Sequence, residues 1–248
     1  MVSGKLIGVG TGPGDPELLT LKAVRVLNEA DVVAHFAKRR EDHLRGSRSN
    51  ARRAAAVHLR PGVTELPLLY PVTTEIDRAH PDYTAAITGF YDQSADDIAA
   101  HLDEGRTVAV LSEGDPFLYG SYMHLHVRLA HRYSTEVVAG ISAMSGCWSA
   151  AGLPFVQGDD VLTVLPGTLP EAELTRRLAD TQAAVIMKVG RNMPAVRRAL
   201  ARTGTLEKAL YVERGTMSNG MTMPLSEKAD DDAPYFSLIL VPGWERRR

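Results

Sequence analysis

The sequence has little cysteine and no long apolar run. Cys147 is the one cysteine among 248 residues, so a disulfide framework and any zinc or iron–sulfur site built from several thiolates are excluded. The longest apolar runs, such as those at 107–111 and 238–241, are far shorter than a membrane span. Because an apolar run begins almost directly after Met1, we expect no signal peptide, no membrane partner and a cytoplasmic location.

The net charge is also small, at −2, which argues against bulk binding to nucleic acid. Basic residues are nevertheless concentrated between Lys38 and Arg60, where eight of them stand beside two acids and give a local charge of +6. A basic patch on a slightly acidic protein favours a discrete anionic ligand over a long polyanion. A solvated basic loop would produce the same pattern, so the charge alone leaves both interpretations open.

With 44% hydrophobic and 23% charged residues, the chain has the composition of a globular protein of one large or two small domains. Strand-like and helix-like patterns alternate through its first half. The expected strands lie at 5–10, 32–36, 64–70, 107–111 and 136–139, with helices at 18–27, 83–102, 122–131 and 143–151. This alternation predicts βαβ units and a parallel sheet, whose strand C-termini share the edge where ligands bind.

The stretch Gly152-Leu153-Pro154 interrupts the pattern, and we place a domain boundary there, giving domains 1–152 and 153–248. Beyond it we expect strands at 161–165, 183–189, 209–213 and 235–241 and helices at 171–178 and 193–202. The pair Asn219-Gly220 indicates a hairpin instead of a crossover, which predicts a mixed sheet. The sequence thus predicts two α/β domains that face each other across a cleft.

A glycine-rich loop at 8–16 follows the first expected strand and precedes a helix, where anion-binding loops sit. It matches neither the dinucleotide fingerprint nor the Walker pattern of phosphate-binding loops. Pro13 removes one amide donor, and Asp15, a good helix N-cap, repels phosphate. The loop therefore suits a neutral or cationic ligand, unless it is only a tight turn.

A second loop, at 113–120, stands at the end of the strand expected at 107–111, on the same sheet edge. Its two acids, Glu113 and Asp115, favour a positively charged ligand, and Gly114 permits close approach of the backbone. One such turn would mean little. Two Gly-Asp-Pro turns at one sheet edge indicate a ligand site.

Several short stretches along nearly the whole chain carry a family resemblance. They are 9–15, 18–23, 114–116, 140–143, 186–188, 213–216 and 234–238. On these stretches the sequence resembles the tetrapyrrole (corrin and porphyrin) methyltransferases, which use S-adenosylmethionine. Within that family, residues 68–73 and 114–122 are most similar to the precorrin-2 C20-methyltransferases. The sequence departs from the usual family pattern at Glu113 and Ala139.

The resemblance implies a homodimeric enzyme that methylates C20 of precorrin-2 to give precorrin-3A and S-adenosylhomocysteine in cobalamin biosynthesis. It also implies a folded cofactor held largely by backbone groups in a cleft between the two domains. Carried over by position, the cofactor contacts are Pro13, Glu113, Gly114, Asp115, Leu118, Ser142, Ala143, Met187 and Gly215. The chemistry of the residues agrees in part, because an acidic turn at Asp115 suits a cation and the Ser142 hydroxyl can donate to a carboxylate.

Tetrapyrrole substrates of this family carry eight carboxylates, which gives the basic segment a role. Four of its arginines are close together in sequence: Arg45, Arg48, Arg52 and Arg53. If residues 47–57 are helical, Arg45, Arg48 and Arg52 share one face and can bind substrate carboxylates bidentately. The alternative is that these arginines pair with surface acids or with solvent.

No pattern in the sequence names a general base, so the catalytic residues stay unknown. His124 and His126 stand two positions apart on an expected helix and point to different faces, so we expect no metal site. Two rival functions stay open. One is methylation of another carbon of a related tetrapyrrole, of the uroporphyrinogen type or cobalt-factor II. The other is a non-catalytic nucleotide-binding α/β protein, against which the missing Walker lysine and Pro13 both count.

Overall fold

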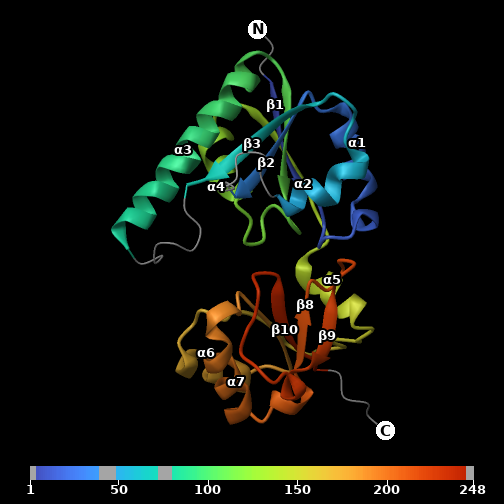
Figure 1. Ribbon diagram of the computed structural model, residues 1–248, viewed down its shortest axis with the longest axis vertical. Helices are drawn as coiled ribbons and strands as arrows, with labels where there is room; N and C mark the ends of the chain where they lie inside the picture. The colour runs from blue at the N-terminus through green and yellow to red at the C-terminus, as the bar shows by residue number, and fades with distance from the viewer. Residues whose placement is uncertain (1–3, 39–48, 72–79, 244–248) are drawn as a thin grey trace. The chain divides into compact units, whose positions relative to one another are not determined.

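The structure is a computed structural model that describes residues 4–38, 49–71 and 80–243. The chain divides into two compact units, Met1–Ser142 and Ala143–Arg248 (Figure 1). The division lies ten residues before the boundary expected at Gly152, because helix α5 (Ala143–Ala150) packs on the sheet of the second unit. Gly152 instead follows that helix with a left-handed backbone, φ 62°, which is a common way for a helix to end.

The described part of the first unit is built on a five-stranded parallel sheet. Its strands, in spatial order, are β3 (Thr64–Tyr70), β2 (Val32–Lys38), β4 (Thr107–Ser112), β1 (Lys5–Gly10) and β5 (Ser134–Val138). The expected parallel sheet is thereby confirmed. The carboxyl ends of these strands meet at one edge, where ligands bind in sheets of this kind.

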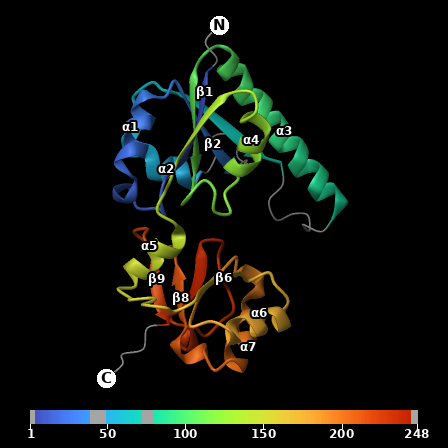
Figure 2. The same ribbon diagram turned by 180° about the vertical axis from the view of Figure 1, so that it is seen from behind.

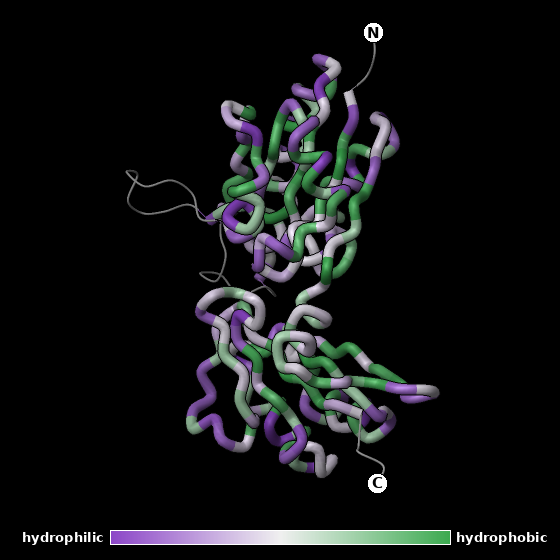
Figure 3. The backbone as a smooth tube through the Cα atoms, turned by 90° about the vertical axis from the view of Figure 1, so that its right-hand side faces the viewer, coloured by the Kyte–Doolittle hydropathy of each residue, from purple (hydrophilic) through white to green (hydrophobic). Residues whose placement is uncertain are grey.

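Helices cover both faces of this sheet (Figure 2). One face carries α1 (Leu21–Glu29) and α2 (Asn50–Ala55), and the other carries α3 (Pro81–Asp103) and α4 (Tyr122–Leu129). The described part of this unit also contains the short 3-10 helices η1 (Pro16–Leu18) and η2 (Ala56–His58). Strand residues alternate between the faces: Leu6 is buried toward α3 and α4, and Ile7 toward α1 and α2. Burial on both faces explains why the three inner strands, β1, β2 and β4, are mostly apolar along their length, whereas the edge strands β3 and β5 are partly exposed. Figure 3 shows the apolar residues of both units in green.

The described part of the second unit holds a mixed five-stranded sheet, as its sequence predicts. In spatial order the strands are β6 (Leu162–Pro166), β7 (Ala183–Met187), β10 (Ser237–Val241), β8 (Leu210–Glu213) and β9 (Met221–Pro224). The pair β6 and β7 is parallel, and the other neighbours are antiparallel. The expected hairpin joins β8 to β9, but Asn219-Gly220 belongs to a longer loop, 214–220, instead of a two-residue turn.

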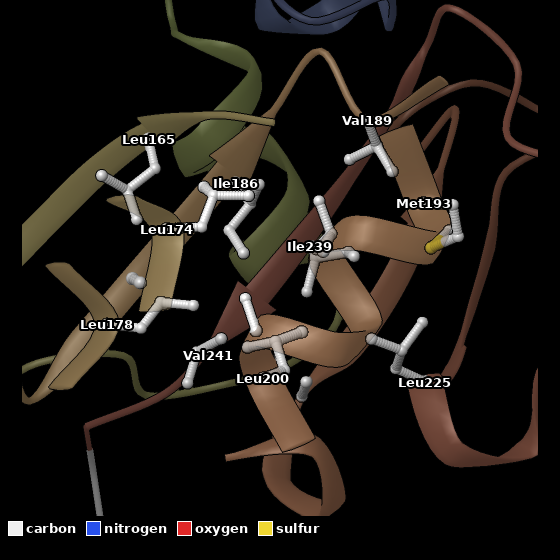
Figure 4. Close-up of a cluster of buried hydrophobic side chains, with 14 of the residues drawn as sticks. Leu165, Leu174, Leu178, Ile186, Val189, Met193, Leu200, Leu225, Ile239 and Val241 are labelled. Carbon is white, nitrogen blue, oxygen red and sulfur yellow. The ribbon is translucent and has the colours of Figure 1, made fainter. Parts of the chain in front are cut away.

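Helices α6 (Glu171–Ala179) and α7 (Met193–Arg202) cover one face of the second sheet, and α5 covers the other. Figure 4 shows the core on the first of these faces, where Leu174 and Leu200 cluster with Ile186 and Ile239. The short 3-10 helices are η3 (Gly190–Asn192), η4 (Leu206–Lys208) and η5 (Leu225–Glu227). Along the described ranges of both units, no helix is long and apolar enough to cross a bilayer.

Glu136 fixes the edge strand β5 of the first unit. Its two carboxylate oxygens lie 2.5 Å from the ammonium groups of Lys5 on β1 and Lys22 on α1. Hydrogen bonds from Lys22 and Lys5 lower the pKa of the Glu136 carboxyl to about 2. A glutamate in an unfolded chain titrates near a pH of about 4.3, so these pairs stabilise the fold above that pH and lose their contribution as the pH falls toward about 2.

We predict that Glu136→Gln lowers the free energy of unfolding by roughly 1 kcal/mol near neutral pH, because both ion pairs are partly exposed. The difference from the unsubstituted protein should shrink when urea denaturation is repeated near pH 3. Glu207→Gln, on the exposed η4, is the control and should change little at either pH. A difference that stays constant between the two pH values would contradict this role of Glu136.

Candidate functional site

Two loops at the carboxyl edge of the first sheet continue the pairing of the strands before them. Beyond β1 and β4, Thr11 N–H donates to the Ser112 carbonyl over 2.9 Å. Further along, Gly114 N–H donates to the Gly12 carbonyl over 2.8 Å. The loops that carry the two Gly-Asp-Pro turns are thus joined directly to each other.

Asp115 ties a third loop, the one after β5, to this pair. Its Oδ2 accepts the Gly140 N–H over 3.1 Å, and its Oδ1 accepts the Phe117 N–H over 2.9 Å. A side chain at Gly140 would not fit, because a Cβ there would lie 2.0 Å from the Gly114 carbonyl oxygen. The Asp115 carboxylate therefore fixes the loops after β4 and β5 to each other, and the Gly114–Gly12 backbone bond adds the loop after β1. Contact of Asp115 with a cationic ligand stays a prediction.

The first loop has the helix cap that its sequence predicts. Asp15 Oδ1 accepts the Glu17 N–H over 2.9 Å at the start of η1. Pro13, at the turn of this loop, is partly exposed. A carboxylate at the start of the helix opposes phosphate binding there, in line with the absence of a Walker pattern.

Helix α2 begins beside the second loop. Burial raises the pKa of the Glu113 carboxyl, which accepts a hydrogen bond from Asn50 and interacts with the charge of Arg53. The Arg53 guanidinium also donates to Asn50 Oδ1 over 2.6 Å. Glu113, where the sequence departs from the usual family pattern, thus links this loop to the helix. Arg53, one of the four arginines predicted to bind substrate, therefore lies next to the loop that contains Glu113.

Arg52 faces a different acid. Its guanidinium donates to both oxygens of Glu65, over 2.7 and 2.9 Å, and His35 Nε2 lies 3.6 Å from the same carboxylate. The hydrogen bonds from Arg52 lower the pKa of the Glu65 carboxyl. Pairing with a surface acid, the alternative left open above, therefore applies to Arg52. Arg45 and Arg48 lie outside the described residues.

Three of the predicted cofactor contacts gather in the second unit. Ala143 and Met187 pack against the apolar cluster that contains Cys147, between α5 and the sheet. A Cβ at Gly215 would lie 2.8 Å from Cys147 Sγ, so the loop after β8 rests on the same helix. We call these three residues the second-unit set. The first-unit set holds the other predicted contacts: Pro13, Glu113, Gly114, Asp115, Leu118 and Ser142.

Unusual backbone geometry marks loops of both sets. Within the described ranges, three non-glycine residues have a left-handed backbone: Tyr119, Lys188 and Arg214, with φ of 55°, 55° and 48°. Each is the sequence neighbour of a predicted contact: Leu118, Met187 and Gly215, in that order. Such geometry costs about 1–3 kcal/mol per residue and clusters at ligand sites. No local pattern in the sequence predicts these positions, although each stands within two residues of a glycine.

The two histidines of α4 contact different side chains. His124 stacks on Tyr91 with ring centroids 4.1 Å apart, whereas His126 meets Phe117 edge-on at 5.0 Å. They face different partners, as their spacing predicts. In the part of the chain that the structure describes, no three His, Cys, Asp or Glu side chains come together as metal ligands.

Comparison with known proteins gives these loops a context. Residues 5–227 match the family model described as Tetrapyrrole (Corrin/Porphyrin) Methylases. The chain belongs to this family. The resemblance seen in the short motifs therefore extends over most of this tetrapyrrole methylase.

Individual relatives are also similar over nearly their whole length. A precorrin-2 C(20)-methyltransferase from Sinorhizobium sp is 66% identical to this tetrapyrrole methylase over 244 residues, which cover 98% of this chain and 97% of the relative. A cobalt-precorrin-2 C(20)-methyltransferase from Salmonella typhimurium is 27% identical over 247 residues, covering 98% and 99%. Among solved structures, a uroporphyrin-III C-methyltransferase from Thermus thermophilus complexed with S-adenosylhomocysteine has a TM-score of 0.63 and 25% identity, covering 96% of each chain.

The residues of both sets fit S-adenosylmethionine, the methyl donor of tetrapyrrole methylases. Half-buried Met187 has the apolar surface that an adenine ring requires, whereas burial raises the pKa of the Glu113 carboxyl and Arg53 already faces it. Two hydroxyls at the base of the loops, Ser112 Oγ and Thr216 Oγ1, are buried without a hydrogen-bond partner among the described residues. Buried polar groups are ordinarily paired, so polar atoms left unpaired beside these loops are consistent with a polar ligand.

We predict that Gly140→Ala destabilises the first unit by about 1–3 kcal/mol, because the added methyl group must push the Gly114 carbonyl away. The free energy of unfolding in urea measures this. Gly89→Ala is the matched control: a Cβ at this position of α3 meets nothing within 4 Å, so it should be neutral or slightly stabilising. Equal effects of the two substitutions would contradict the close packing of the three loops.

Proposed function

We propose that this tetrapyrrole methylase transfers the methyl group of S-adenosylmethionine to C20 of precorrin-2 in the cytoplasmic synthesis of cobalamin. The products are precorrin-3A, S-adenosylhomocysteine and a proton. The observation that carries the proposal is 66% identity to a precorrin-2 C(20)-methyltransferase over 244 residues, covering 97% of that relative. The strained loops at the predicted cofactor contacts support it, because they stand where the family resemblance puts the methyl donor.

Both sets of predicted contacts keep their role in cofactor binding in this proposal. The first-unit set supplies loop amides and acids, and the second-unit set supplies the apolar surface of Met187 and the small residue Gly215. S-adenosylmethionine itself supplies a methyl group activated by its sulfonium. The protein holds this donor on loops that are already tied together by Asp115, so little ordering is needed on binding.

The chain's principal contribution to the reaction is alignment. C20 of the reduced macrocycle is nucleophilic enough to attack the methyl group directly, so the two reacting atoms need to be held about 3–3.5 Å apart and in line. Positioning of this kind supplies roughly 7–11 kcal/mol. We assign no general base.

The basic segment binds carboxylates of the macrocycle in this proposal. Described residues of this segment lie at the ligand edge of the sheet: Lys38 ends β2, and Ser49 caps α2, whose Asn50 bonds Glu113. Arg53 stands next to the loops, which supports its role. Arg45 and Arg48 keep the same proposed role, and Arg52 contributes least, because Glu65 already accepts both of its hydrogen bonds.

The direct test of the function is analysis of the product. Purified enzyme is incubated with precorrin-2 and S-adenosylmethionine labelled with carbon-13 in its methyl group, and NMR then locates the label. The proposal expects the label on C20 alone. A parallel reaction with the cobalt-bearing substrate addresses the alternative suggested by the Salmonella relative, and we expect the metal-free substrate to react faster. Label on another ring carbon, or preference for the cobalt form, would contradict the proposal.

We predict that Asp115→Ala weakens binding of S-adenosylhomocysteine by about 1.5–3 kcal/mol in isothermal titration, because the loops lose their tie. Asp115→Asn separates two roles of this residue. If the carboxylate acts by fixing the loops, the amide oxygen keeps one of its two backbone bonds and the loss should be about half. If it acts by its charge on the cofactor, both variants should lose equal affinity. Unchanged affinity in both variants would show that Asp115 takes no part in cofactor binding.

We predict that Arg48→Gln and Arg53→Gln each raise the KM for precorrin-2 several-fold, and that Arg48→Gln leaves cofactor affinity unchanged. The wild-type kcat/KM should fall as salt rises, because the Debye length is roughly 10 Å at 0.1 M and shorter above it. Both variants should show a flatter salt dependence. Arg52→Gln is the comparison, and should change the KM least. Identical salt dependence of kcat/KM for the wild type and the three variants would indicate that the basic segment is a solvated loop that does not bind substrate.

We also propose that the enzyme is a homodimer, as the family resemblance implies. Two apolar side chains of the first unit, Leu21 at the start of α1 and Val57 in η2, are 90% and 73% exposed. Burial of such residues against a second copy would remove apolar surface from water. Multi-angle light scattering should give twice the chain mass, and a monomer mass would refute this proposal.

A further inference from the structure

One serine hydroxyl joins three elements of the first unit that are far apart in sequence. Ser121, just before α4, is hydrogen-bonded through its Oγ to the hydroxyl of Tyr70, the last residue of β3. The hydroxyl of Tyr91, in the middle of α3, donates to the same Oγ over 3.1 Å. We call these three residues the hydroxyl network.

Aromatic rings surround the hydroxyl network. Phe36, near the end of β2, stacks on Tyr70 with centroids 5.8 Å apart, and Phe90 lies 4.7 Å from Tyr70. His124 of α4 stacks on Tyr91 at 4.1 Å. Tyr91 is buried, whereas Tyr70 and Ser121 are half-buried and His124 is exposed. The polar atoms therefore lie where the aromatic cluster reaches solvent.

The position of the network relates it to the cofactor loops. Tyr70 ends a strand, so it lies at the carboxyl edge of the parallel sheet, on which the loops after β1, β4 and β5 also stand. Ser121 directly follows the loop that contains Asp115. The network also joins the two stretches, 68–73 and 114–122, on which the sequence most resembles the precorrin-2 C20 group.

A purely structural role does not need these hydroxyls. The neighbouring Leu68 already fixes β3 to the core with 2% exposure, and apolar side chains would hold Tyr70 and Tyr91 in place equally well. A hydrogen bond between two such hydroxyls contributes only about 0.5–1.5 kcal/mol to stability, which is small beside the burial of the aromatic rings. A rigid pair of rings with polar tips at a half-exposed site is suited to a large ligand with apolar faces and polar edges.

We propose that Tyr70 contacts the tetrapyrrole and orients it, with Ser121 and Tyr91 as positioning residues that hold the Tyr70 hydroxyl. This inference rests on the proposed function and adds to it a substrate contact outside the basic segment. The aromatic rings pack beside the macrocycle, and the Tyr70 hydroxyl bonds to a polar group at its edge. The methyl transfer itself is unchanged, and no proton is transferred through the network.

The test uses the full-length enzyme with Tyr70→Phe and Ser121→Ala, separately and together. Each single variant should lower kcat/KM for precorrin-2 roughly ten-fold, the effect of about one hydrogen bond, and leave the affinity for S-adenosylhomocysteine unchanged. The double variant should be no worse than the single ones, because both remove the same contact. Tyr133→Phe is the matched control. The Tyr133 hydroxyl donates to Asp103 over 2.7 Å at the C-terminal end of α3, and loss of this hydroxyl should leave kcat/KM unchanged.

A second readout keeps this test separate from that of the proposed function. The same proteins are titrated with uroporphyrin III, a stable tetrapyrrole with eight carboxylates, and binding is followed by its fluorescence. Tyr70→Phe and Ser121→Ala should bind it several-fold more weakly than the wild type and Tyr133→Phe, whichever tetrapyrrole the enzyme methylates. Binding equal to the wild type in both variants, or an equal loss in the Tyr133 control, would overturn the inference.

Discussion

The candidate site depends on one carboxylate that holds backbone groups. Asp115 accepts the amides of Gly140 and Phe117, and the adjacent Gly114 amide bonds to Gly12. Through these contacts the loops after β1, β4 and β5 become one platform instead of three independent segments. A platform of this kind has little freedom to lose on binding, which is the property that a methyl donor held in line with its acceptor requires.

The loops of the candidate site contain strained backbone conformations. Three non-glycine residues of the described ranges adopt left-handed geometry, one in the Asp115 loop and two in the second-unit loops beside Met187 and Gly215. Close packing at Gly140 adds a constraint, since no side chain larger than hydrogen fits there. Strain and close approach coincide with the contacts that the family resemblance assigns to the cofactor, in both units, and this coincidence supports the proposed site beyond the sequence identity.

Regular elements could be predicted from the sequence because their patterns are local. The helix at 193–202 has the predicted bounds, and the parallel and mixed sheets follow from apolar runs and turn residues. The expected domain boundary at Gly152 and the unit division at Ser142 differ for a physical reason. A glycine that ends a helix and a glycine in a linker look the same in sequence, and only the packing of α5 separates them.

Side-chain partners were harder to predict, because they depend on tertiary contacts. The acidic turn at Asp115 suggested a contact with a cation, yet its oxygens first meet backbone amides. Arg52 shares the spacing of the other arginines but pairs with Glu65, which is distant in sequence. Likewise, nothing local connects Tyr70 to Ser121 before the fold brings the end of β3 close to the residue that precedes α4.

Native-state hydrogen exchange, followed by NMR at the amides of Gly114 and Gly140, tests the preformed platform most directly. Both amides have acceptors within the loops, so the account predicts strong protection in the protein without ligand and only a small increase when S-adenosylhomocysteine is added. Rapid exchange in the free protein, with protection gained only on binding, would contradict it. The loops would then be ordered by the cofactor and not by Asp115.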